Sequence, residues 1–356
     1  MFRDSDGAGT GSSAGGGTLP HCAGGTGAAA IAAAAPPARA GLRSPGLSNP
    51  RGPGPRLPKP DWLKVKVPQG ERFEWIRSRA RSLNLHTVCE EARCPNIGEC
   101  WRGGTATFML MGDSCTRGCR FCSVNTAKHP AALDGEEPVK IAETIREMGL
   151  DYVVLTTVNR DDLPDQGSAH IAETVRRTQL ANPRLLIEVL IPDFRGDEAC
   201  LERVLAARPA VLAHNVETVP RLSPIVRDPR AGFEQSLRVL EHAKRAGLPP
   251  GGRHDALRTK SSLMLGLGES GEEVLEAMRA LRGVGVDFLT LGQYLQPGKR
   301  NLPVVEYVPP ERFKLLERQG LQMGFRYVAA GPLVRSSYRA AEFFIAQDLR
   351  AGSASA

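Results

Sequence analysis

The amino-acid sequence predicts an α/β fold, an open (β/α)6 partial TIM-like barrel in which parallel strands alternate with helices. Short β-rich runs alternate with helix-like patterns from about residue 105 onward, and such alternation is typical of a parallel sheet with helices outside it. Six repeats are fewer than the eight that close a full barrel. We therefore expect a functional site in the loops that follow the C-terminal ends of the strands.

The individual elements follow from the spacing of apolar residues. The expected strands are short runs rich in β-branched and aromatic residues, at residues 105–111, 152–157, 185–190, 211–214, 262–265 and 288–291. The expected helices repeat apolar residues at spacings of three and four, at residues 139–148, 171–179, 198–207, 233–246 and 272–281.

Composition divides the chain into four parts. Residues 1–60 are dominated by Gly, Ala, Ser, Pro and Arg, and such a stretch buries too little apolar surface to offset its chain entropy. It is predicted to be a disordered low-complexity tail. Residues 61–104 form an N-terminal extension and 105–330 the partial barrel. Residues 331–356 form a C-terminal segment, and the two extensions are expected to close the site.

Charge and hydropathy exclude several classes of partner. The chain carries a net charge of +7, and residues 1–60 contribute six Lys/Arg and two Asp to it. No basic run with interleaved aromatic residues appears, so we expect no nucleic-acid partner; a mildly basic face for an acidic protein stays open. No transmembrane run or secretory segment appears, which predicts no membrane partner and a cytoplasmic protein. The Arg and Ala content of the tail leaves a mitochondrial or plastid transit peptide as the alternative.

Six of the eight cysteines fall into two ordered triads. These are Cys89-x4-Cys94-x5-Cys100 and Cys115-x3-Cys119-x2-Cys122. A reducing compartment disfavours disulfides, and structural zinc prefers paired motifs that close a set of four ligands. Each triad is one ligand short of the four that hold a four-iron cluster. The pattern therefore favours two clusters, each with one iron open to another ligand, and the second triad directly follows the first expected strand.

The second triad resembles the signature of the radical S-adenosylmethionine (SAM) enzymes, and the wider sequence resembles the lipoyl synthase family over about residues 60–350. The matching segments are Cys115-Thr-Arg-Gly-Cys119-Arg-Phe-Cys122, Glu91-Ala-Arg-Cys94-Pro-Asn-Ile-Gly-Glu-Cys100-Trp101, Arg160-Asp-Asp-Leu-Pro-Asp165, Ile187-Glu-Val-Leu-Ile-Pro-Asp193, His214-Asn-Val-Glu-Thr218, Lys260-Ser-Ser-Leu-Met-Leu-Gly-Leu-Gly-Glu269 and Arg335-Ser-Ser-Tyr338. The cysteine signature alone indicates the superfamily, whereas its combination with the upstream triad and the terminal motif indicates the family.

The resemblance implies an activity and two clusters. Lipoyl synthases insert sulfur at C6 and C8 of an octanoyl chain attached to a carrier-protein lysine, and a radical removes hydrogen from these unactivated carbons. The resemblance implies a [4Fe–4S] cluster with SAM as co-substrate on the second triad. It implies an auxiliary [4Fe–4S] cluster, the sulfur source, on the first triad with Ser337 as fourth ligand. Ser336 is the adjacent alternative, and a simple helix N-cap for residues 338–346 is another interpretation of the serine pair.

Further residues and partners follow from the same resemblance. The expected SAM contacts are Asn159, Glu188, Asn215 and Glu217. Glu188 could instead form a buried ion pair, because an unpaired acid inside an apolar strand is costly. Residues 160–162 could bind SAM or order their loop. The implied partners are octanoylated lipoyl-carrier domains, of the glycine cleavage H protein or 2-oxoacid dehydrogenase E2 type, and an electron donor such as ferredoxin or flavodoxin.

Two other functions are alternatives to sulfur insertion into a protein-bound octanoyl group. A biotin-synthase-like enzyme would insert sulfur into a free small molecule, but the upstream triad and the terminal Arg-Ser-Ser-Tyr argue against it. A non-catalytic iron–sulfur electron carrier or scaffold would not cleave SAM.

Overall fold

The computed structural model describes residues 57–64, 71–83, 85–91, 94, 96–102, 106–247 and 257–337. The predictions of a disordered tail over residues 1–60 and of a helix over 338–346 therefore fall mostly or wholly outside the described residues. Within the described part, no helix is long and apolar enough to cross a membrane.

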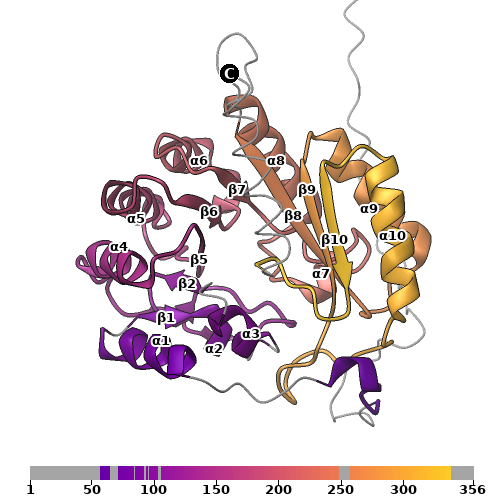
Figure 1. Cartoon of the computed structure of the whole chain (residues 1–356). Coiled ribbons are helices and arrows are strands. Elements are labelled where there is room, and N and C mark those ends of the chain that lie inside the picture. The colour runs from indigo at the N-terminus through magenta and orange to yellow at the C-terminus, as the bar shows by residue number, and fades with distance from the viewer. Residues whose placement is uncertain are drawn as a thin grey trace, which may run out of the picture. The chain divides into compact units, whose positions relative to one another are not determined.

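An eight-stranded, mostly parallel sheet forms the centre of the described chain (Figure 1). Its order is β1-β2-β5-β6-β7-β8-β9-β10, and only β1 is antiparallel to its neighbour. The strands are β1 (His86–Thr87), β2 (Thr107–Leu110), β5 (Tyr152–Thr157), β6 (Leu186–Leu190), β7 (Val211–Ala213), β8 (Arg258–Leu265), β9 (Phe288–Gln293) and β10 (Tyr327–Gly331). Because β1 and β10 do not pair, the sheet stays open.

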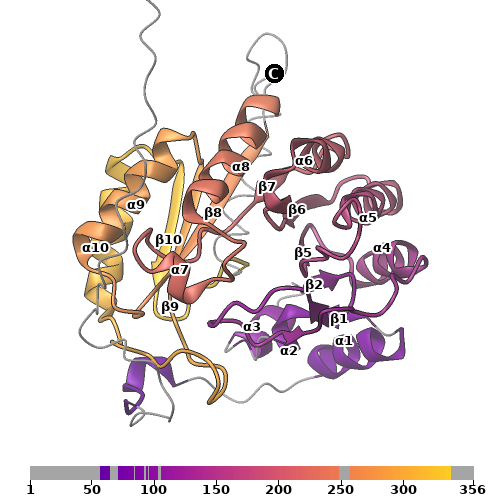
Figure 2. The ribbon, with the colours of Figure 1, turned by 180° about the vertical axis from the view of Figure 1, so that it is seen from behind.

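Helices follow most strands and cover the outside of the sheet (Figures 1 and 2). They are α1 (Glu71–Ser82), α2 (Val88–Glu91), α3 (Ile97–Arg102), α4 (Glu137–Met148), α5 (Ser168–Ala181), α6 (Glu198–Leu205), α7 (Ser223–Val226), α8 (Phe233–Ala246), α9 (Gly271–Gly283) and α10 (Pro310–Gln322), with a short 3-10 turn at Asp61–Leu63 and another at Phe194–Gly196. Six β/α units run from β2–α4 to β9–α10, and β10 follows them. The predicted (β/α)6 partial barrel is therefore confirmed.

Some elements differ from the sequence predictions. The predicted strand at 262–265 is only the second half of β8, because the first half, Arg258–Ser261, is polar yet buried and hides the apolar pattern. The strands β1 and β10 were not predicted: β1 has two residues, and β10 ends in the small residues Ala329-Ala-Gly331. The helices α1 and α10 were also missed.

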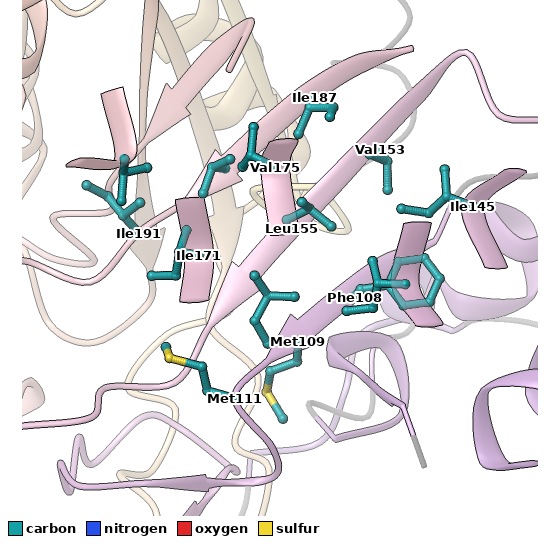
Figure 3. Close-up of a cluster of buried hydrophobic side chains, with 14 of the residues drawn as sticks. Phe108, Met109, Met111, Ile145, Val153, Leu155, Ile171, Val175, Ile187 and Ile191 are labelled. Atoms are coloured by element: carbon teal, nitrogen blue, oxygen red, sulfur yellow. The ribbon is translucent and has the colours of Figure 1, made fainter. Parts of the chain in front are cut away.

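Two apolar cores lie between the sheet and its helices. One joins β2, β5 and β6 to α4, α5 and α6, with Phe108, Leu155 and Ile171 among its buried residues (Figure 3). The other joins β8, β9 and β10 to α9 and α10. A third, smaller cluster brings together Tyr152, Val154, Val211, Phe288 and Ala329. These five come from strands that are not all neighbours, so they meet across the inner face of the curved sheet.

Candidate active site

The second cysteine triad lies in the loop that follows β2, as predicted. Cys115 ends the short strand β3 (Ser114–Cys115), which pairs in parallel with β4 (Asn125–Thr126). Loops from β5, β7 and β9 donate or accept hydrogen bonds along residues 116–122. The loop therefore rests on the C-terminal ends of the parallel strands.

Backbone N–H groups point at the sulfur atoms of this triad. The amides of Asn159 and Arg117 donate to Cys115 Sγ over 3.3 and 3.4 Å. The amide of Asp228 donates to Cys119 Sγ over 3.3 Å. Such N–H donors stabilise thiolate sulfur and tune an iron–sulfur cluster bound to it.

The three thiols also share one electrostatic environment. Burial, together with a smaller contribution from negative charge on Cys115, raises the pKa of Cys119 to about 11 and the pKa of Cys122 to about 12. All three thiols are free. Among the described residues, no three His, Cys, Asp or Glu side chains converge as ligands of a single metal ion. Three soft, half-buried sulfur donors with N–H partners fit an iron–sulfur cluster, which is held by thiolates on several irons.

Arg117, inside the C-x3-C segment, joins this loop to two neighbouring loops. Its Nε and Nη2 atoms donate to the two carboxylate oxygens of Asp161 over 2.9 and 2.8 Å, and its Nη1 donates to Asp193 over 2.8 Å. Arg117 is only 4 % exposed. Although burial opposes it, the hydrogen bonds to Asp161 and Asp193 raise the pKa of Arg117, so the guanidinium stays charged. Asp161, one of the residues predicted to bind SAM or order the loop, orders the loop here.

Three more residues hold the loop from other sides. The Asp228 carboxylate accepts from Gly118 N over 2.9 Å and from Arg230, while Arg230 also donates to Thr116 O. On the β9 side, Asn301 Nδ2 donates to Cys122 O over 2.7 Å and to Arg120 O over 3.3 Å. The conformation of the thiol loop is thereby set by contacts along most of its length.

The first cysteine triad is held differently. Cys89 and Cys100 are buried in the apolar core near Trp101. Burial raises the pKa of the Cys94 thiol, while a hydrogen bond from the Asn96 backbone and the charge of Arg335 oppose that rise. Asn96 Nδ2 donates to Leu333 O over 2.6 Å. The N-terminal extension thus meets the C-terminal segment at the first triad.

Ser336 and Ser337 follow Arg335 directly and are partly buried. Their position next to Arg335, whose charge acts on Cys94, is compatible with the predicted cluster ligand. The choice between the two serines stays a prediction.

The predicted SAM contacts occupy different places. Glu188 is fully buried and accepts from Lys260 Nζ over 2.9 and 2.8 Å and from the Tyr152 hydroxyl over 2.6 Å. It therefore forms the buried ion pair that was the alternative interpretation. Asn159 contributes its backbone to Cys115. Its role, and that of Glu188, in SAM binding stays a prediction.

Glu217 and Asn215 come after β7, at the C-terminal end of the strand. Glu217 has a left-handed backbone, with φ of 67°. Burial raises the pKa of Glu217, and a hydrogen bond from Asn215 opposes that rise. Its negative charge in turn raises the pKa of both Cys119 and Cys122, so the carboxylate lies within electrostatic reach of the thiols. The Asn215 Oδ1 atom is buried without a hydrogen-bond partner, which suits contact with a bound molecule.

Sequence reasoning missed several residues around the triad. Arg117, Asp193 and Asp228 all support the loop, yet none was assigned a role. Asp193 directly follows a strand and Arg117 lies within the cysteine signature, so their positions were a usable signal. Asn301 lies in a loop, and nothing in the neighbouring sequence indicates that it contacts the cysteine segment.

The fold and the cysteine loop define a class of protein that comparisons with known families identify. The model of the radical SAM superfamily matches residues 109–281, and the model of the N-terminal domain of lipoyl synthase of the radical SAM family matches residues 46–94. The crystal structure of Streptococcus suis SuiB bound to precursor peptide SuiA has a similar fold. Its TM-score is 0.50 at 9 % identity, over 72 % of this chain and 52 % of that chain.

Close relatives narrow the class to one family. The chain is 57 % identical to the mitochondrial lipoyl synthase of Homo sapiens over 82 % of this chain and 77 % of that protein. It is 59 % identical to the lipoyl synthase of Anaeromyxobacter dehalogenans over 81 % of this chain and 95 % of that protein. The chain belongs to the lipoyl synthase family. It is a radical SAM enzyme that inserts sulfur, and the class uses SAM and a [4Fe–4S] cluster.

Proposed function

We propose that the protein inserts two sulfur atoms at C6 and C8 of an octanoyl-lysine group on a carrier protein and so forms lipoyl-lysine. The observation that carries the proposal is the presence of two separate thiol triads with different surroundings. One lies on the strand ends of the barrel, and the other lies where the two extensions of the chain meet. Two chemical tasks, radical generation and sulfur donation, call for two such sites.

The residues of the chain divide these tasks. Cys115, Cys119 and Cys122 would hold the [4Fe–4S] cluster that binds SAM, while Cys89, Cys94 and Cys100 with Ser337 would hold the auxiliary cluster. When bound, the clusters supply the electron that cleaves SAM and the sulfur that is inserted. A serine hydroxyl is a harder ligand than a thiolate and suits iron–sulfur clusters less well, so this position favours loss of iron during the reaction.

Other residues would orient the reactants. Glu217 and Asn215 lie near the thiol loop with polar groups to offer, and we assign them to SAM together with Asn159. Glu188, which forms an ion pair with Lys260, is the fourth proposed SAM contact, and a purely structural ion pair is the alternative. The same proposal divides the chain into an extension over 61–104, a barrel over 105–330 and a C-terminal segment over 331–356.

The proposed partners are octanoylated lipoyl-carrier domains, of the H-protein or E2 type, and a ferredoxin or flavodoxin as electron donor. Relatives of this chain include mitochondrial and bacterial proteins. We propose a cytoplasmic location, with an organelle as the alternative if the tail is a transit peptide.

The test of this function is an anaerobic reaction with a chemical reductant. The protein reconstituted with iron and sulfide receives SAM, dithionite and an octanoyl-lysine peptide, and mass spectrometry follows the peptide. We expect the peptide to gain two sulfur atoms while 5′-deoxyadenosine is released. Release of 5′-deoxyadenosine without any sulfur in the peptide would contradict the proposed substrate. If neither 5′-deoxyadenosine nor a sulfur-bearing peptide formed, the result would favour a non-catalytic iron–sulfur protein.

A further inference from the structure

An exposed group of cations lies beside the second cysteine triad and has no role in the function proposed so far. Arg120 belongs to the thiol loop itself, between Cys119 and Cys122. Lys299 and Arg300 belong to the turn after β9. All three side chains are exposed.

The turn that carries Lys299 and Arg300 is fixed against the thiol loop. Leu302 N donates to Arg120 O over 3.1 Å, and Asn301 Nδ2 donates to Cys122 O over 2.7 Å. The turn itself closes through Asn301 N and Gly298 O over 3.1 Å. Lys299 and Arg300 therefore directly precede Asn301 and Leu302, the two residues that contact the segment bearing the triad.

These cations differ from the other basic residues around the loop. Arg117 and Arg230 are matched by Asp161, Asp193 and Asp228. Arg120, Lys299 and Arg300 have no side-chain ion pair among the residues that the structure describes. Neighbouring like charges repel, and a surface that keeps several of them unpaired is suited to an oppositely charged partner.

We propose that Arg120, Lys299 and Arg300 form the docking surface for an acidic electron-donor protein. This inference rests on the proposed function, because only a reductive reaction needs such a donor. For each SAM cleaved, the donor would be oxidised by one electron, and the [4Fe–4S] cluster that Cys115, Cys119 and Cys122 would hold would accept it. The cations are exposed beside the loop that bears this triad, so a donor that binds them comes close to the thiols. Weak redox complexes of this kind have small interfaces steered by charge.

The experiment compares two double variants of the full-length, reconstituted protein. In the first, Lys299→Glu and Arg300→Glu reverse both charges of the turn. In the control, Lys314→Glu and Arg318→Glu reverse two exposed cations on α10. Both variants change the net charge equally. The probe is an acidic [2Fe–2S] ferredoxin, and its affinity is measured by titration at low and high salt alongside the rate of peptide sulfuration.

We expect the first variant to bind the ferredoxin about tenfold more weakly at low salt, since steering by several charges changes association by ten- to a thousandfold. High salt should shrink the difference, because it screens surface charges. With dithionite in place of ferredoxin, sulfuration and iron content should match the unchanged protein. The control variant should bind ferredoxin normally.

Three results would overturn the proposal. One is ferredoxin binding that is unchanged in the turn variant at low salt. Another is equal loss of rate with both reductants at full iron content, which would place the two residues in the reaction site. The third is a raised KM for an octanoylated carrier domain with normal ferredoxin affinity, which would assign the surface to the carrier. Failure of the proposed function itself would appear separately, as absent sulfuration of the unchanged protein with dithionite.

Discussion

The two cysteine triads are built in opposite ways. The triad in the loop after β2 is held by side chains from several strand ends, among them Asp161, Asp193 and Asn301. The triad of the N-terminal extension is held by apolar packing of Cys89 and Cys100 and by contact with the C-terminal segment through Asn96. The second triad is therefore held mainly by loops of the barrel, whereas the first triad lies where the two extensions of the chain meet.

This difference matches the two proposed tasks. A site that binds SAM in every cycle benefits from a loop that keeps one geometry, because catalysis depends on preorganised groups. A site that gives up sulfur must release and regain its contents. Segments joined by few polar contacts can open locally at lower free-energy cost than a loop with ion pairs on several sides.

The largest expected effect comes from removing one thiol of either triad. Cys119→Ala should abolish release of 5′-deoxyadenosine from SAM, because the triad then has two thiols. Cys94→Ala should retain that release and lose all sulfur insertion. Chromatography of 5′-deoxyadenosine and mass spectrometry of the peptide measure both. Equal loss of SAM cleavage in the two variants would show that the triads do not act separately.

A large effect limited to the first triad is expected from Gly292→Ala. Gly292, in β9, has no side chain, and a Cβ there would collide with Val334 O of the C-terminal segment. Overpacking of this kind costs about 1–3 kcal/mol. We expect the segment to shift, so that the auxiliary cluster is lost while SAM cleavage stays. Iron analysis should show about half the normal content.

The matched control for this change is Gly283→Ala. Gly283 lies at the end of α9, and no atom lies within 4 Å of the position of an added Cβ. This variant should keep full iron content. If both glycine variants retain it, the segment does not depend on the space that Gly292 leaves.

A moderate effect on the second triad is expected from Arg117→Lys. A lysine keeps the charge but has one ammonium group, so it cannot replace the paired hydrogen bonds to Asp161 together with the bond to Asp193. We expect about 2 kcal/mol lower stability and an altered EPR signal of the reduced, SAM-bound protein. As a control, Arg177→Lys changes an exposed pair with Glu173 and should shift stability by less than about 0.5 kcal/mol. An unchanged EPR signal in Arg117→Lys would remove this residue from loop positioning.

The smallest expected effects come from two buried asparagines that play matching parts at the two sites. Asn301 donates to Cys122 O, and Asn96 donates to Leu333 O. Replacing either by Ala should cost about 1 kcal/mol in thermal unfolding experiments. Asn301→Ala should slow SAM cleavage, and Asn96→Ala should speed loss of auxiliary iron to a chelator. If the two variants changed SAM cleavage and loss of auxiliary iron equally, the two triads would not be held by separate contacts.

The sequence predicted the barrel well where apolar spacing was clear. The helix expected over residues 233–246 coincides with α8, and the strand expected over 152–157 coincides with β5. Apolar spacing did not predict the first half of β8, which is polar yet buried. Its Lys260 is stabilised by Glu188 from another strand. Local pattern contains no information about such a partner.

The six cysteines could be predicted as cluster ligands because ligand spacing is a local signal. The partners of Arg117 could not be predicted, because Asp161 and Asp193 lie 44 and 76 residues further along the chain. Only the folded sheet brings these loops together. The contact between Asn96 and Leu333 spans 237 residues and was equally invisible, although the resemblance predicted that the C-terminal segment would reach the first triad.

The most direct test of the two-site account is to trace the inserted sulfur. Protein reconstituted with heavy-isotope sulfide and freed of unbound sulfide is mixed with SAM, dithionite and octanoyl-lysine peptide for a single turnover. We predict that the peptide gains two heavy sulfur atoms, and that Cys94→Ala protein releases 5′-deoxyadenosine but leaves the peptide without sulfur. Heavy sulfur in the peptide made by Cys94→Ala protein would contradict the assignment of sulfur donation to the first triad.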